Sequence, residues 1–288
     1  MDADQLLATV AGLVWPDFGE LTCDEPGHPA GHVCLPVSAS TPVNYLVETI
    51  DDRYGSPHSH LPSLPCDEEI DWLCAWAFGG RWIAFGHYRS GVDVRPVVTV
   101  TERSTPSPDQ LPAEASWLDR LVAITGWAPG QAHEVDWAAV ESRLGTRLPT
   151  DYKRLVETFG EGQFDGFLDV YLPETMRQFA ACEAALGQQP WEPHPPFPAP
   201  DGLLPWAGNE HEQAFYWITE SPDPDQWPIY ATGVGSEEGH RFDCSATEFL
   251  FRQLTDRRHP FSIPADFHAH WFLSYDGSGE RSYAAADR

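Results

Sequence analysis

The chain has 288 residues, of which 42% are hydrophobic and 12% aromatic, including 12 Trp. That composition supplies packed cores for one large domain or two ordinary ones, and it excludes wholesale disorder. The formal net charge is -27, from 44 acidic and 17 basic residues. Because so acidic a surface repels nucleic acid and anionic membranes, the sequence excludes both as partners and favours cationic ones.

The chain shows no signal for export or for membrane insertion. No run of about 18 apolar residues is present, and Asp2 and Asp4 stand where a secretory signal would be basic. We therefore expect a cytoplasmic protein. Its six cysteines are scattered and would stay reduced there, so no disulfide is expected. Nearly all basic residues are Arg, which is typical of a bacterial protein from a high-GC genome.

The first hundred residues combine helical and strand patterns. Residues 4–14 and 42–53 read as helices, whereas residues 17–41 show no sustained period and read as loop. Between residues 70 and 102, three strand-like runs joined by Gly79-Gly80 and by a turn near Gly91 predict an antiparallel meander. Pro96 would place the third strand at an edge of that sheet.

A composition change separates this part from the rest. Residues 103–115 hold three prolines and several small polar residues, which is typical of a linker. We predict two α+β domains, each a mostly antiparallel sheet with helices packed on it. The predicted ranges are 1–104 for the first domain, 105–116 for the linker, 117–260 for the second domain and 261–288 for a C-terminal extension.

The second half shows clear helix boundaries. Asp136 is placed to cap a helix that Gly145 ends, Thr150 to cap the next helix, and Ser245 with Glu248 to form a capping box before a last helix. Between these, the sequence predicts a helix at 174–186, a Pro-rich irregular segment at 187–202, and strands near 167–171, 203–206, 214–219 and 227–232.

Residues 135–174 carry an ordered set of motifs. They read VDWAAVESRLGTRLPTDYKRLVETFGEGQFDGFLDVYLPE, in which a Trp precedes a VE..LG..LP.DY segment and a G.G.F.G.L turn. A LLPWAG run, a Tyr-Trp strand, a Trp-Pro-Ile strand and a Glu-Phe-Leu helix follow. Over residues about 117–256 the chain resembles the SUKH (SMI1/KNR4-like) superfamily. The motif residues, which we interpret as mainly structural, are Trp137, Glu141, Gly145, Leu148, Pro149, Tyr152, Gly160, Gly162, Phe164, Gly166 and Pro173.

This resemblance implies an α+β fold with helices packed to one side of a mostly antiparallel sheet. It also implies binding to a partner protein, as in bacterial toxin-immunity proteins. The partner would be a cognate polymorphic toxin, most often one with a nuclease or other nucleic-acid-targeting domain. The alternative that the resemblance leaves open is a non-catalytic regulatory or scaffold module. Oligomeric state is not indicated.

Acidic residues beside the motif turns are the candidate partner contacts. A nuclease must have a basic substrate groove, and acidic side chains would complement it. The alternative is that these carboxylates are only solvated surface charges. The candidates are Glu157, Glu161, Asp165, Asp169, Glu210, Glu212, Asp223 and Asp225.

Few residues suggest chemistry. Cys23, His28, His32 and Cys34 offer zinc-type ligands, but they lack a C-x2-C or HExxH spacing, so the sequence predicts no metal site. The alternate histidines of His58-Ser-His60 and His268-Ala-His270 are expected to face solvent. No nucleophile elbow, phosphate loop or dinucleotide fingerprint is present, so we expect no cofactor and no enzyme.

Overall fold

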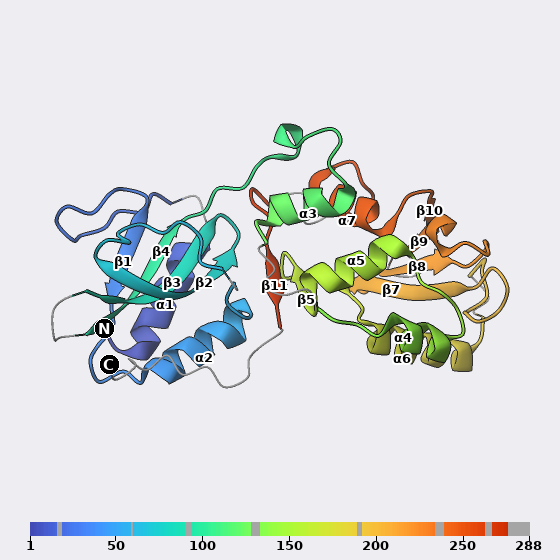
Figure 1. The fold of residues 1–288 in the computed structure, drawn as a ribbon, viewed down its shortest axis with the longest axis horizontal. Helices are drawn as coiled ribbons and strands as arrows, with labels where there is room; N and C mark the ends of the chain where they lie inside the picture. The colour runs from blue at the N-terminus through green and yellow to red at the C-terminus, as the bar shows by residue number, and fades with distance from the viewer. Residues whose placement is uncertain are drawn as a thin grey trace. The chain divides into compact units, whose positions relative to one another are not determined.

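The computed structural model describes residues 1–15, 19–58, 60–89, 94–127, 133–188, 192–233, 239–262 and 267–275 (Figure 1). The chain forms two compact units. One comprises Met1–Ser107, Ile124–Gly130 and Phe267–Arg288, and the other Pro108–Ala123 and Gln131–Asp266. Both combine helices with an antiparallel sheet, which confirms the predicted α+β class. The domain ranges expected from the sequence remain a proposal.

The first unit is built on a four-stranded antiparallel sheet in the order β1-β4-β3-β2. Its core joins the buried faces of two helices to the sheet, with Leu6 and Ile50 packed in one cluster with Trp76. The bounds are α1 Ala3–Val14, β1 His32–Pro36, α2 Val43–Tyr54, β2 Ile70–Phe78, β3 Arg81–Tyr88, β4 Arg95–Glu102 and β11 Phe272–Ser274.

Two expectations for this sheet are wrong. Residues 32–36 form a strand rather than loop, and because this strand pairs with β4, β4 is not an edge strand. Pro96 is tolerated there because β1 pairs with β4 only from Val97 to Thr101, so the missing N–H removes no bond to β1. The Pro96 carbonyl still accepts a hydrogen bond from the Val37 N–H, at 3.2 Å.

The expectation that both histidine pairs face solvent is wrong for one histidine of each pair. His60 and His268 are exposed as expected, but His58 and His270 are buried. The His58 ring makes edge contacts with the rings of Trp82 and Trp127, and burial, followed by the charge of Arg103, lowers the pKa of His58 to about 3.

The second unit is built on a longer antiparallel sheet. Its strands run in the order β10-β9-β8-β7-β6-β5. The strands are β5 Gly162–Phe164, β6 Leu168–Val170, β7 Leu203–Asn209, β8 Ala214–Ile218, β9 Ile229–Thr232 and β10 Gly239–Phe242. The helices are α3 Trp117–Thr125, which leads back to the first unit, α4 Trp137–Leu144, α5 Thr150–Phe159, α6 Pro173–Leu186 and α7 Ala246–Thr255, with 3-10 turns η1 Pro108–Gln110 and η2 Pro224–Gln226.

Helices cover both faces of this sheet. Tyr216 and Trp217 are neighbours in β8, so their side chains point to opposite faces. The Trp217 ring contacts the Tyr152 ring of α5, with centroids 5.1 Å apart, whereas the Tyr216 hydroxyl donates to Glu183 of α6 at 2.9 Å. The expectation of helices on one side is therefore wrong, because α6 lies on the face opposite α5.

The predicted helix caps are mostly confirmed. Asp136 accepts from the Ala139 N–H, Gly145 ends α4 with a φ of 80°, and Ser245 accepts from the Glu248 N–H. Thr150 is different, because α5 begins at Thr150 itself. Its N–H and hydroxyl donate to the Asp225 carboxylate at 2.5 and 2.9 Å, so the cap comes from a segment 75 residues away.

Two further features concern the cysteine side chains and the apolar character of the helices. All six cysteines lie in the described part of the chain, and all are free thiols. Among the helices that the structure describes, none has the length and apolar character needed to cross a membrane.

Candidate partner-binding site

The exposed side of α6 borders a cavity in the second unit. α6 starts with Pro173 in its first turn and buries Met176 and Ala180 below it. The helix ends at Gly187, whose φ of 73° turns the chain away. The cavity at this end has a volume of about 200 Å³, and we call it the α6 pocket. It is lined by Glu183, Leu186, Gly187, Gln188, Glu192, His194, Pro196, Leu203, Tyr216 and Thr232.

Two carboxylates dominate the electrostatics of the α6 pocket. The pKa of Glu183 is raised to about 6, chiefly by burial; the hydrogen bond from Tyr216 acts against this shift, and the charge of Glu192 adds to it. Burial also raises the pKa of Glu192, against a hydrogen bond from Tyr230 and the charge of His194. Within the described residues, the Glu192 Oε1 atom is buried and has no hydrogen-bond partner. Since buried acceptors are normally satisfied, this oxygen can accept a hydrogen bond from a donor that enters the pocket.

Two apolar side chains are exposed on α6, the helix that carries Glu183. Leu186 is 76% exposed and Phe179 is 45% exposed. The Phe179 ring stacks on the Tyr171 ring, with centroids 4.7 Å apart, which holds it in place. A cavity of ~150 Å³ is large enough for benzene, so the α6 pocket can receive one side chain of a partner. Exposed apolar side chains beside a pocket that can receive an anchor residue are typical of the core of a protein interface.

Neutralising Glu183 is expected to stabilise the folded chain at neutral pH. A carboxyl whose pKa is raised in the folded chain binds its proton more tightly there than in the unfolded chain. The stability of the wild-type chain relative to a variant with a neutral side chain therefore falls as pH rises from about 4.5 to 6. The full shift corresponds to ~2 kcal/mol, and partial solvent exposure reduces it to ~1 kcal/mol. Urea unfolding of Glu183→Gln should show that gain at pH 7.5.

The same variant provides its own control. At pH 4, both the wild-type carboxyl and the glutamine are uncharged, so the difference in unfolding free energy should shrink to a few tenths of a kcal/mol. Tyr216→Phe removes the donor to Glu183 and should be destabilising at pH 7.5. An equal effect of Glu183→Gln at both pH values would contradict this account of the pocket.

The motif residues hold the second unit together. Tyr152 is fully buried and its hydroxyl donates to the Tyr171 carbonyl at 2.6 Å. Glu141 accepts from the Leu148 N–H at 2.9 Å and forms an ion pair with Lys153. These contacts lie inside the unit, which agrees with a structural role for the motif.

The motif region matches a known family. Residues 131–252 match the model of the SMI1 / KNR4 family (SUKH-1). This segment is a SUKH-1 domain. The resemblance found in the sequence is therefore confirmed. No curated protein and no solved structure matches the chain. The SUKH family consists generally of non-catalytic immunity proteins, and a protein partner is consistent with it.

Three of the expected contact residues gather at one end of the SUKH-1 sheet. Asp169 lies on β6, and Glu210 and Glu212 lie in the turn between β7 and β8. Glu210 is exposed, and its carboxylate lies 3.5 Å from the Gln163 amide. Burial raises the pKa of Asp169; the hydrogen bond from Gln163 acts against this shift, and repulsion from Glu210 adds to it. These residues form an acidic group, and exposed Glu161 lies just before β5.

The other expected contacts have partners within the domain. Asp165 is only 4% exposed and takes a φ of 55° in the β5–β6 turn, so it does not fit an accessible surface. Asp225 caps α5, and Asp223 accepts from the Asp225 N–H at the start of η2. Glu157 accepts from the Trp137 indole at 2.6 Å. The eight residues therefore do not form one continuous surface.

The α6 pocket itself was not found from the sequence. Residues 187–202 read as an irregular Pro-rich segment, and that interpretation hid the role of Glu192. One available signal was Leu186, a large apolar residue directly before Gly187 at the end of the helix. The pairing of Glu183 with Tyr216 had no local signal, because 33 residues separate the two.

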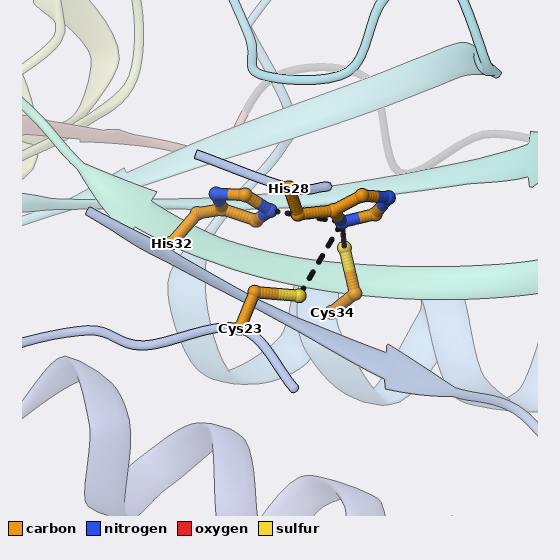
Figure 2. A group of neighbouring side chains, drawn as sticks. All are labelled: Cys23, His28, His32 and Cys34. Atoms are coloured by element: carbon orange, nitrogen blue, oxygen red, sulfur yellow. Dashed lines mark hydrogen bonds between the residues drawn. The ribbon is translucent and has the colours of Figure 1, made fainter. Parts of the chain in front are cut away.

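The sequence also named a Cys and His set that the fold brings together. One ligand atom from each of Cys23, His28, His32 and Cys34 lies within 4.8 Å of all the others. The spacing along the sequence argued against a metal site, but spacing does not record how close the four side chains lie in the fold. A loop folds back onto a strand to assemble the group (Figure 2). This group lies in the first unit, outside the SUKH-1 domain.

Proposed function

We propose that the chain is an immunity protein whose SUKH-1 domain binds and blocks a cognate bacterial toxin. The observation that carries the proposal is the α6 pocket, where Glu192 Oε1 is buried and has no hydrogen-bond partner within the described residues. A guanidinium or ammonium group of the toxin would satisfy this oxygen and neutralise Glu183 beside it.

Charge complementarity supports a basic partner. The net charge of -27 makes the surface attractive to a nuclease-type toxin, whose substrate groove must bind phosphates. Burial chiefly, and then the charges of Asp169 and Glu183, raises the pKa of Tyr171, so that residue lies within electrostatic reach of both carboxylates. Asp169, a member of the acidic group, and Glu183 of the pocket therefore both act on Tyr171.

In this proposal the domain inhibits the toxin by binding alone and catalyses no reaction on it. A basic side chain would enter the α6 pocket and donate to Glu192 and Glu183. Its aliphatic stem, or a neighbouring apolar side chain, would pack on Leu186 and Phe179, which are exposed in the free chain. Because the inserted residue would come from a groove that binds nucleic acid, the bound domain covers that groove.

The test is binding and protection with the toxin domain encoded by the neighbouring gene. We expect a tight complex in calorimetry, with a dissociation constant that rises at least tenfold between 50 and 300 mM NaCl, because exposed charge attraction is screened by salt. We also expect co-expression of the full chain to rescue cells from the toxin.

The outcomes separate the possible roles. Binding without rescue of the cells would favour the regulatory or scaffold role and would contradict immunity. Absence of both binding and rescue would remove the proposal. A complex insensitive to salt would leave immunity in place but contradict the acidic surface as its basis.

A further inference from the structure

A loop and a strand of the first unit bring four zinc-type ligands to one point. Cys23 and His28 lie in the loop before β1, and His32 and Cys34 lie on β1 itself (Figure 2). Residues i and i+2 of a strand share a face, so the His32 ring and the Cys34 thiol point the same way. The loop closes on itself through the Gly31 N–H, which donates to the Leu21 carbonyl at 3.0 Å.

Three of the six distances between the ligand atoms are close to those of a tetrahedral zinc site, and all four atoms lie within 4.8 Å of one another. With Zn–N near 2.05 Å and Zn–S near 2.3 Å, two nitrogens stand about 3.3 Å apart and a nitrogen and a sulfur about 3.6 Å apart. His28 Nδ1 lies 3.3 Å from His32 Nε2, 3.3 Å from Cys23 Sγ and 3.6 Å from Cys34 Sγ. The three separations agree with that geometry.

Hydrogen bonding alone does not account for this convergence. A neutral imidazole nitrogen either donates one proton or accepts with one lone pair. His28 Nδ1 has three polar neighbours at these distances, and Figure 2 shows all three directed at the same ring atom. A shared central cation satisfies all four ligand atoms at once, whereas the hydrogen bonds compete with one another.

The surroundings of the group are those of a metal site. The other ring nitrogen of His28, Nε2, lies 3.3 Å from the Glu69 carboxylate, which is the arrangement that orients a metal-bound histidine. The Cys34 thiol contacts the Thr99 hydroxyl at 3.4 Å, a donor suited to a thiolate. The side chain of His28 is 5% exposed and His32 is fully buried, so the two imidazoles are shielded from water, while the two thiols are half-buried.

We propose that Cys23, His28, His32 and Cys34 bind one zinc ion in a structural site. Two thiolates and two imidazoles suit zinc and disfavour magnesium or calcium, which prefer oxygen ligands. Four protein ligands fill a tetrahedral ion and leave no position for substrate, so the site is structural. The ion fastens the loop at residues 21–31 to β1. This proposal is independent of toxin binding.

The first test is metal content and cobalt spectroscopy of the full chain. Purified without chelator, it should contain one zinc per chain by mass spectrometry of the metal. Replacement of zinc by cobalt should give the visible absorption of a tetrahedral ion and the near-ultraviolet band of sulfur-to-cobalt charge transfer. Substoichiometric metal together with an octahedral cobalt spectrum of the wild-type chain would overturn the proposal, whatever any variant does.

Variants then assign the ligands. Cys23→Ser should abolish stoichiometric zinc and weaken the charge-transfer band, whereas Cys182→Ser, at an exposed thiol of the second unit, should change neither. Glu69→Gln keeps all four ligands and should weaken zinc binding by about 10-fold to 100-fold in competition with a chromophoric chelator. Unchanged affinity of Glu69→Gln would contradict its role in orienting His28.

Cys66 is the residue that could replace one of the four. Its thiol lies 3.8 Å from His32 Nε2, farther than the three contacts of His28 Nδ1. We expect Cys66→Ser to retain one zinc and the same cobalt spectrum. Loss of the metal in Cys66→Ser would show that the ligand set proposed here is wrong.

Discussion

Replacing both pocket carboxylates, Glu183→Gln with Glu192→Gln, is expected to weaken toxin binding by about 100-fold or more. Removing one side of a desolvated charge pair costs ~2–5 kcal/mol, largely because the other charge is left buried without a partner, and 2.7 kcal/mol corresponds to about 100-fold in Kd. The toxin's cation would be that unpaired charge. Calorimetry at 150 mM NaCl would measure the change.

A matched control distinguishes the pocket from net charge. Glu114→Gln with Glu134→Gln removes the same two charges from exposed positions of the second unit outside the α6 pocket. We expect it to lower affinity by less than about fivefold, mainly through the association rate. Because Glu183→Gln should itself stabilise the fold, weak binding of the pocket variant cannot be ascribed to unfolding. Similar losses for both double variants would contradict the pocket as the binding point.

Local patterns were sufficient to predict most helices and strands. Apolar spacing located α1 and α2, and Asp136 with Gly145 marked both ends of α4, because caps depend on a few neighbouring residues. The strand β1 was missed because its sequence, HVCLP, is short and does not alternate. Its pairing with β4 depends on residues more than 60 positions away, which no local pattern records.

The same limit applies to the candidate sites. Nearness to the motif turns favours the acidic residues as partner contacts, yet Asp225 caps α5, whose first residue lies 75 positions earlier in the chain. Composition could not separate such carboxylates from solvated ones, since 44 acidic residues are present. The Cys and His set has zinc-type ligand atoms, but the sequence predicted no metal site, because its geometry depends on a loop returning to β1. Spacing rules describe metal sites on helices and short turns, not that arrangement.

Arg103→Met is expected to destabilise the first unit by ~3–5 kcal/mol, because each buried carbonyl left without its donor costs ~1–3 kcal/mol. The Arg103 guanidinium is buried and donates to the carbonyls of Gly79 and His270, at 2.8 and 2.9 Å, and of Thr125. It also lies over the Trp82 ring, at 5.3 Å. Methionine fills the space but leaves three carbonyls without these donors.

The position of these carbonyls explains why one residue matters so much. Gly79 lies in the turn between β2 and β3, Thr125 ends α3, and His270 precedes β11, so one guanidinium links three segments distant in sequence. Lysine has a single ammonium and cannot reproduce that fork, so Arg103→Lys should be nearly as destabilising as Arg103→Met. Arg154→Met, at an exposed position of α5, should change the unfolding free energy by less than about 0.5 kcal/mol.

Hydrogen exchange locates the effect within the chain. If Arg103 fastens the segment at 267–275, amides there should lose protection in Arg103→Met, as should the amide of residue 103, which donates to the Gly80 carbonyl. Amides of β7 and β8 in the SUKH-1 domain should keep theirs. Uniform loss of protection would mean that the two units unfold together. A free energy of unfolding for Arg103→Met within 1 kcal/mol of the wild-type value would show that the three carbonyls find other donors. It would also show that this network does not stabilise the unit.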